Sequence, residues 1–126
     1  MILGVFTPLF ADLSFEEMLD RAKSAGLDAV EIGTGGNPGN HHCPTDELLA
    51  SPEKRQAYLA ELEKRGLTIS AFSCHSNPIS PDATEARESD EILRKSIQLA
   101  ALMGVPVVNT FSGTAGDSED AKAPNW

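Results

Sequence analysis

The stretch Leu67-Thr-Ile-Ser-Ala-Phe-Ser-Cys-His-Ser-Asn-Pro78 joins an apolar run to a short polar cluster. Gly66 stands just before it, behind a basic pair, which is the pattern with which a helix ends. Ile69 and Phe72 give the run the apolar character of a strand, and Pro78 stops that strand from continuing. Because side chains that do chemistry gather at the carboxyl ends of parallel strands, the polar cluster is predicted to form one wall of a site.

The same transition from helix to strand occurs three times along the chain. Gly26, Gly66 and Gly104 each follow a helix-like segment and precede a strand-like run, and they recur about every 40 residues. This spacing is typical of successive βα units, whose right-handed crossovers place neighbouring strands parallel around one core. The sequence therefore predicts an α/β fold with a parallel βα repeat.

The remaining elements follow from periodicity and capping. Short apolar runs predict four strands, within residues 2–6, 27–32, 67–78 and 105–111. Apolar residues at helical spacing predict three helices, over residues 14–26, 45–65 (restarting at Pro52) and 82–103. The first strand is expected to be buried on both faces. Four strands and three helices amount to roughly half of a (β/α)₈ TIM barrel, which typically needs about 250 residues.

Residues 112–126 form a polar segment that follows the fourth strand and stops before any fourth helix. We therefore expect residues 1–126 to be the N-terminal half of a TIM-barrel domain, truncated after strand four. Such a half would expose edge strands and an inner apolar face. This exposure favours a homo-oligomer, or pairing with a partner, as an alternative role for a non-catalytic half-barrel.

Composition narrows the classes of partner. The chain of 126 residues carries 19 acidic and 10 basic side chains, for a formal charge of −9, and its basic residues are scattered. This balance disfavours nucleic acid and anionic membrane surfaces as partners. Residues 1–6 lack the basic start of a signal peptide, so a cytoplasmic location is expected. Cys43 and Cys74 are too few for a disulfide scaffold and are expected to be free thiols.

Three side chains at predicted strand ends are candidates for substrate contact. His75 can hydrogen-bond a sugar hydroxyl, bind a metal ion or transfer protons, unless neighbouring backbone groups satisfy it. Asn77 is either a contact or a turn former. Glu31 can face the barrel interior as a substrate or metal contact, or belong to a structural ion pair.

Other motifs support a site less well. Phe6 is either an apolar wall or simply core. The histidines and cysteines within residues 41–43 and 74–75 are five possible ligands for a soft metal ion, but their spacing does not match that of structural zinc sites. Residues 33–39 are rich in glycine yet lack a phosphate-binding motif, so a flexible lip is expected there. The acidic residues within 117–120 are either a hard-cation site or a solvated loop.

Several of these segments together resemble one family. They are Val30-Glu31-Ile32-Gly33, Ser73-Cys74-His75-Ser76-Asn77-Pro78, Asn109-Thr110-Phe111-Ser112-Gly113, Gly116 and Pro124-Asn125-Trp126. They resemble the xylose-isomerase-like TIM barrels, the sugar phosphate isomerase/epimerase group, over the N-terminal half of that barrel. The resemblance implies a divalent metal ion (Mn, Mg, Co or Zn) that polarises a sugar substrate while paired acidic residues move a proton between carbons. Those metal ligands and acids come from later strands in the family, so no catalytic or metal residue is assigned to this chain.

The resemblance also implies a substrate-pocket role for residues at the strand ends. They are Phe6, Glu31, His75, Asn77, Ser112 and Trp126. We therefore expect the chain to be the N-terminal portion of a metal-dependent sugar (phosphate) isomerase or epimerase, inactive by itself. Apurinic endonuclease relatives place a metal-binding histidine where His75 stands, but the acidic charge argues against an endonuclease-IV-like metal hydrolase.

Overall fold

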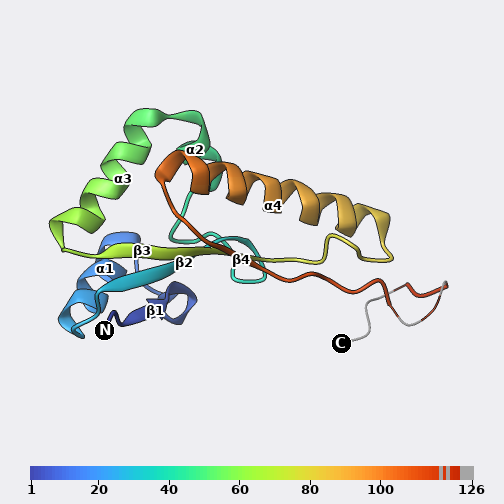
Figure 1. The fold of residues 1–126 in the computed structure, drawn as a ribbon, viewed down its shortest axis with the longest axis horizontal. Helices are drawn as coiled ribbons and strands as arrows, with labels where there is room; N and C mark the ends of the chain where they lie inside the picture. Colours follow the sequence, from blue (N-terminus) through green and yellow to red (C-terminus); the bar gives the residue numbers. More distant parts are fainter. Residues whose placement is uncertain (117, 119, 123–126) are drawn as a thin grey trace.

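The structure is a computed structural model that describes residues 1–116, 118 and 120–122. Its strands are β1 (Gly4–Phe6), β2 (Ala29–Gly36), β3 (Thr68–His75) and β4 (Val108–Thr110). Its helices are the 3₁₀-helix η1 (Thr7–Phe10), α1 (Phe15–Ser24), α2 (Thr45–Ala50), α3 (Pro52–Lys64) and α4 (Ala83–Met103). The strands pair in parallel in the order β1-β2-β3-β4 (Figure 1). This alternation of parallel strands and helices confirms the predicted partial TIM barrel.

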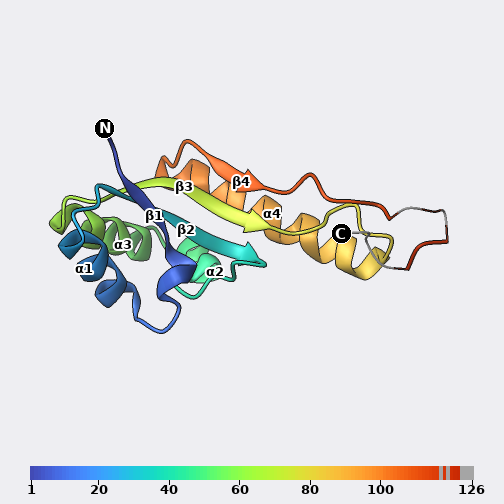
Figure 2. The same ribbon diagram turned by 90° about the horizontal axis from the view of Figure 1, so that it is seen from below.

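The hydrophobic core lies between the sheet and the helices. Val30, Ile32 and Phe72 are fully buried and supply the sheet side of the core. The helices supply Met18, Leu19, Ala22, Leu48, Tyr58, Leu62, Leu99, Ala100 and Met103. Because successive strand residues point to opposite faces, Glu31 and Ser73 lie on the other face of the sheet, away from this core. Figure 2 shows the sheet from the side opposite the helices α2, α3 and α4.

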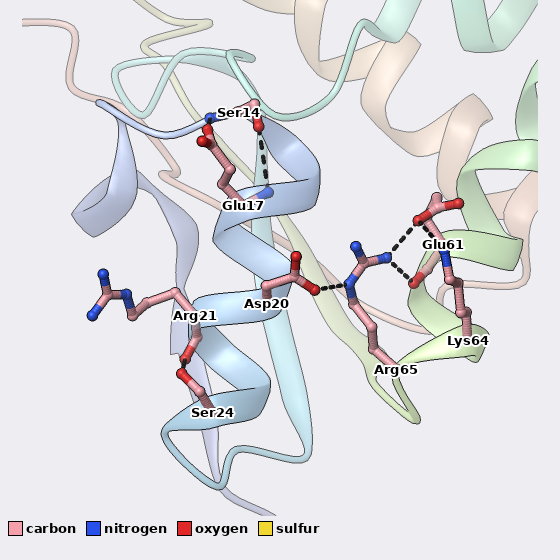
Figure 3. A network of polar contacts seen from close by, with 8 residues as sticks. All are labelled: Ser14, Glu17, Asp20, Arg21, Ser24, Glu61, Lys64 and Arg65. Atoms are coloured by element: carbon pink, nitrogen blue, oxygen red, sulfur yellow. Dashed lines mark hydrogen bonds and ion pairs between the residues drawn. The ribbon is translucent and has the colours of Figure 1, made fainter.

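Helix α1 begins at the predicted capping box. The Ser14 hydroxyl accepts a hydrogen bond from the Glu17 backbone N–H, and the Glu17 carboxylate accepts one from the Ser14 N–H (Figure 3). These two bonds satisfy backbone donors that a helix start leaves open. The bond from the Ser14 N–H to the carboxylate also lowers the pKa of Glu17, because it favours the charged form.

Arg65 connects the end of α3 to α1. Its guanidinium donates to Asp20 on α1 and to both the carboxylate and the backbone carbonyl of Glu61 (Figure 3). The hydrogen bonds from Arg65 lower the pKa of the Asp20 and Glu61 carboxyls. The Arg65 side chain is only 12% exposed, so this arrangement fixes two neighbouring helices to each other.

The predicted helix over residues 45–65 is two helices. Ser51 lies between α2 and α3 in an extended conformation, its hydroxyl accepts from the Lys54 N–H, and Pro52 occupies the first turn of α3. Tyr58 of α3 stacks on Phe15 of α1 at a centroid distance of 4.1 Å. The restart predicted at Pro52 is therefore a true break between the two helices.

The expected flexible lip at residues 33–39 is wrong in its first half. β2 continues through Gly36, because glycine permits close approach there rather than loop flexibility. A Cβ atom on Gly35 would collide with Ile92 of α4, and one on Gly36 would collide with the carbonyl of His75. A Cβ atom on Gly33 would lie 2.7 Å from the Gly39 oxygen. The glycines thus let α4 and β3 pack directly against the backbone of β2.

The expectation that strand one is buried on both faces is also wrong. β1 pairs only with β2 in this sheet, and Ile2 beside it is 76% exposed. β4 is shorter than predicted, because the Val105 N–H bonds to Ala100 and so completes the end of α4. The sheet therefore has two open edges, at β1 and β4. Across the described part of the chain, no helix combines the length and apolar character needed to cross a bilayer.

Candidate functional site

A polar cluster around the Glu31 carboxylate occupies the face of the sheet that turns away from the core. Glu31 Oε1 accepts hydrogen bonds from the Ser73 hydroxyl and from Asn109 Nδ2, the latter at 2.9 Å. Three neighbouring strands supply these groups, since β2 pairs with β3 and β3 with β4. Within the described residues Glu31 has no cationic partner, so the structural ion pair is not the role seen. Glu31 Oε2 has no hydrogen-bond donor among them and is open to a ligand hydroxyl.

An aromatic group stands at the carboxyl ends of the same strands. The His75 imidazole stacks on Phe111 with centroids 4.5 Å apart and planes 13° apart. The Phe6 ring also neighbours this imidazole, with centroids 5.9 Å apart and planes tilted by 49°. Within the described chain neither ring nitrogen of His75 has a hydrogen-bond partner, so backbone groups do not satisfy this imidazole. The structure thus brings Phe6, Glu31 and His75 onto one face of the sheet.

Asn77 is engaged elsewhere. Its side chain is buried, donates to the Thr114 carbonyl at 2.9 Å and accepts from the Thr114 N–H at 2.9 Å. Ser112 is exposed on the segment after β4, and Trp126 lies outside the described residues. The predicted substrate contacts at Asn77, Ser112 and Trp126 therefore stay predictions, and the amide of Asn77 already has two backbone partners.

Three residues of this site were not singled out from the sequence. Ser73 and Asn109 hold Glu31, and Phe111 stacks on His75. Strand alternation is the signal that would have found the first, because Ser73 stands two residues before His75 and so shares its face. The contributions of Asn109 and Phe111 depend on the register between β3 and β4, which pairs Ser73 with Asn109.

A cavity of about 660 Å³ opens beside His75. It lies between the carboxyl ends of β2 and β3 and the N-terminal half of α4, and its lining includes Asn37, Phe111 and Ser89. In Figures 1 and 2, α4 runs past the end of the sheet in the direction taken by the chain after β4. The site therefore has an aromatic and carboxylate wall on the sheet and a second compartment against α4.

The described residues do not fit a divalent metal ion. No three His, Cys, Asp or Glu side chains among them gather closely enough to hold one. His41 and His42 both contact the Leu13 carbonyl, at 3.1 and 3.0 Å, rather than facing the cysteines. Cys43 and Cys74 are buried free thiols, and burial raises the pKa of Cys43 to about 12, so the thiolate that metals bind is disfavoured.

The acidic residues predicted as a hard-cation site lie mostly beyond what the structure places. Asp117 and Glu119 are outside the described residues. No chemical step of this site is therefore derived through a metal ion. What the described side chains offer is binding chemistry: aromatic faces, an open carboxylate oxygen and an unbonded imidazole.

Comparison with known proteins gives the same fold. A family profile described as xylose isomerase-like TIM barrel matches residues 19–125. The uncharacterized protein YfiH of Bacillus subtilis is 40% identical over 126 residues, which are 100% of this chain and 40% of YfiH. The crystal structure of the probable 3-DHS dehydratase AsbF, involved in petrobactin synthesis, from Bacillus anthracis superposes with a TM-score of 0.64.

The AsbF match covers 90% of this chain and 39% of AsbF, at 21% sequence identity, so it bears on the fold alone. The chain spans about two fifths of the length of either protein. Its sequence match to the family profile nevertheless runs from α1 to the segment after β4. The chain therefore belongs to the xylose isomerase-like TIM barrel family.

Proposed function

We propose that this chain is the sugar-binding N-terminal part of an isomerase or epimerase that moves a proton between adjacent carbons of a ketose or aldose. The observation that carries the proposal is the placement of His75, stacked on Phe111, at the ends of the strands that also present Glu31. The match to the family profile, which covers most of the chain, also supports this proposal.

The chemistry of this wall suits a small polyhydroxylated ligand. Aromatic faces such as Phe6 and Phe111 pack against the C–H faces of a sugar ring or chain. The open Oε2 of Glu31 accepts hydrogen bonds from sugar hydroxyls, and the His75 ring nitrogens both accept and donate them. In this proposal, residues outside 1–126 supply the acid–base pair and the ligands of the divalent metal ion, since the described residues gather no metal ligands.

Ligand titration tests the binding part of the proposal. The ¹⁵N-labelled chain is titrated with D-fructose, D-psicose and D-tagatose, and we expect amide shifts around residues 73–77 and 109–111. Glu31→Gln, which keeps an acceptor for Ser73, and His75→Ala should each weaken these shifts several-fold. His41→Ala removes an exposed imidazole from a different loop and should leave them unchanged. Absence of any shift in the wild-type chain would contradict the proposal.

Turnover tests the enzymatic part. A version extended beyond Trp126 is assayed for ketose interconversion with added Mn²⁺, Mg²⁺ or Co²⁺. We expect metal-stimulated exchange of a carbon-bound proton with solvent, and loss of it in the 126-residue chain. An extended protein that folds and exchanges no proton on any ketose would count heavily against this function.

The open sheet edges favour a second role, association with another copy of the chain. Two copies related by a twofold axis would place β1 of one beside β4 of the other and close eight parallel strands. Exposed apolar side chains at both edges, Ile2 and Leu3 near β1 and Val107 next to β4, fit such pairing. Native mass spectrometry checks it: a well-folded monomer at all concentrations would exclude self-association.

A further inference from the structure

The cavity beside His75 has a negatively charged lining. Two carboxylates, Glu85 and Glu88, stand three residues apart on α4 and both line it. Among the described residues, no lysine or arginine lines this cavity. Carboxylates accept hydrogen bonds and cannot donate them when ionised, so they pair with hydroxyl or ammonium groups and repel phosphate.

The N-terminus of α4 is also closed to anions. A helix N-terminus ordinarily binds phosphate through its unpaired N–H groups. Here the Asp82 carboxylate already accepts from the Thr84 and Glu85 N–H groups, at 2.8 and 2.9 Å. Asp82 thus occupies the position that a phosphate would take.

The glycine-rich end of β2 offers no phosphate cradle either. The Asn37 N–H donates to the His75 carbonyl at 2.7 Å, and the Gly39 N–H donates to the Gly36 carbonyl at 3.0 Å. Gly36 itself lies against the backbone of β3. These two backbone donors of the Gly-rich segment are therefore already bonded within the protein.

Polar groups in the cavity remain open to a neutral ligand. Ser89 is 5% exposed and lines the cavity, and within the described part of the chain its hydroxyl has no hydrogen-bond partner. The ring nitrogens of His75 are likewise unbonded, as described above. Because no buried side-chain polar atom of the described residues lacks a partner, the Ser89 hydroxyl is accessible from the cavity, where it can bond to a ligand.

We infer that this cavity holds the far end of the substrate and selects an unphosphorylated sugar, with Glu85 and Glu88 as the residues that determine this specificity. The inference rests on the proposed sugar-binding function and adds the substrate class to it. Sugar hydroxyls donate to Glu88, to Glu85, whose carboxylate also accepts from the Ser80 hydroxyl, and to Ser89. A phosphate ester at the same end meets the two carboxylates and no cation on the described wall.

The test compares two ligands that differ only by a phosphate. The labelled 126-residue chain is titrated with D-fructose and with D-fructose 6-phosphate, and amide shifts of His75, Ser76 and Ser89 report occupancy. We expect D-fructose to bind at least about tenfold more tightly, which corresponds to about 1.4 kcal/mol. Inorganic phosphate, as a third probe, should leave these amides unshifted.

Paired variants separate a local effect from net charge. Glu85→Gln with Glu88→Gln should reduce the preference for the unphosphorylated sugar several-fold. Glu16→Gln with Glu91→Gln removes the same charge from exposed positions that do not line the cavity, and should leave the preference as it was. Circular dichroism of both double variants establishes that each keeps the fold.

The outcomes distinguish this inference from the function on which it rests. If D-fructose 6-phosphate binds as tightly as D-fructose, the specificity is wrong while the sugar-binding function stands. If the Glu85/Glu88 pair and the control pair change the preference equally, these two residues do not determine it and the inference fails. If neither sugar shifts any amide, the proposed function fails, and the substrate class fails with it.

Discussion

Asn77 and Thr114 are joined by two reciprocal hydrogen bonds, each 2.9 Å long, between the side-chain amide of one and the backbone of the other. They tie the turn after β3 to the segment that follows β4. Both the NH₂ group and the oxygen of the Asn77 side-chain amide take part, and the residue is 2% exposed. The position of Thr114 is therefore set by a side chain 37 residues earlier in the chain.

Asn77→Ala is expected to destabilise the chain by about 1–3 kcal/mol, because it leaves the Thr114 N–H and carbonyl without partners. Urea unfolding followed by circular dichroism gives this difference in the free energy of unfolding. Asn40→Ala, at an exposed asparagine, serves as the control and should cost little. Equal stability of the two variants would mean that the Asn77 bonds contribute nothing net.

Gly36→Ala should cost more than Gly39→Ala, although both glycines have nearly the same backbone angle, φ of +66° and +67°. Each substitution pays for a left-handed backbone, roughly 1–2 kcal/mol. Only at Gly36 does the new methyl group also collide with the His75 carbonyl, whereas nothing lies within 4 Å of Gly39. Thermal unfolding of the two variants measures the difference, and identical losses would contradict the close packing of β2 on β3.

Stability should fall as the pH drops below about 6.5, in part because of His42. Burial lowers the pKa of this imidazole in the folded state below its ordinary value of 6.5. The unfolded chain then binds a proton that the folded chain resists, so the stabilisation is complete above pH 6.5 and is lost as the pH falls toward the folded pKa.

Urea unfolding of wild type and His42→Gln at pH 7.5, 6.5 and 5.5 measures this fall. The variant should lose less stability over that interval than the wild type does. His41→Gln removes the exposed neighbour that contacts the same Leu13 carbonyl, and it should keep most of the wild-type fall. A His42→Gln profile that superposes on the wild type would show that His42 is not responsible.

Arg65→Met should lower the urea midpoint more than Arg94→Met. Arg65 bonds Asp20 and Glu61 from a side chain that is 12% exposed, while Arg94 makes a single pair with Asp90 from a side chain that is 76% exposed. Exposed single pairs contribute little and are screened by salt. The two midpoints are compared at low and high NaCl, and a larger loss for Arg94→Met would contradict the structural role of Arg65.

Local signals predicted the framework of this fold well. Helix starts and ends depend on neighbouring residues, as with the Ser14 capping box and the glycines at 66 and 104, so they could be read from the chain. The parallel sheet followed from the spacing of those glycines. The end of β2 was predicted wrongly. Glycine is needed at positions 35 and 36 because Ile92 and His75 pack closely there, and these two residues are distant in the sequence.

The site was predictable only in part for the same reason. The strand period places Glu31 on one face of β2 and His75 on one face of β3, and the structure brings both onto the same face of the sheet, while their substrate contacts stay predictions. Their partners Asn109 and Phe111 depend on strand register, which no local pattern encodes. Asn77 was predicted as a contact, yet its bonds to Thr114 could not be foreseen from a turn signal alone.

The order of the sheet has a consequence for synthesis. Strand order follows chain order, so each strand pairs with the one that left the ribosome just before it. The capping box, the Arg65 contacts and the packing of α4 on β2 are all complete once residues up to 110 have emerged. Such vectorial pairing needs no partner from farther along the nascent polypeptide. The growing chain can therefore bury its core and position Glu31 and His75 during translation.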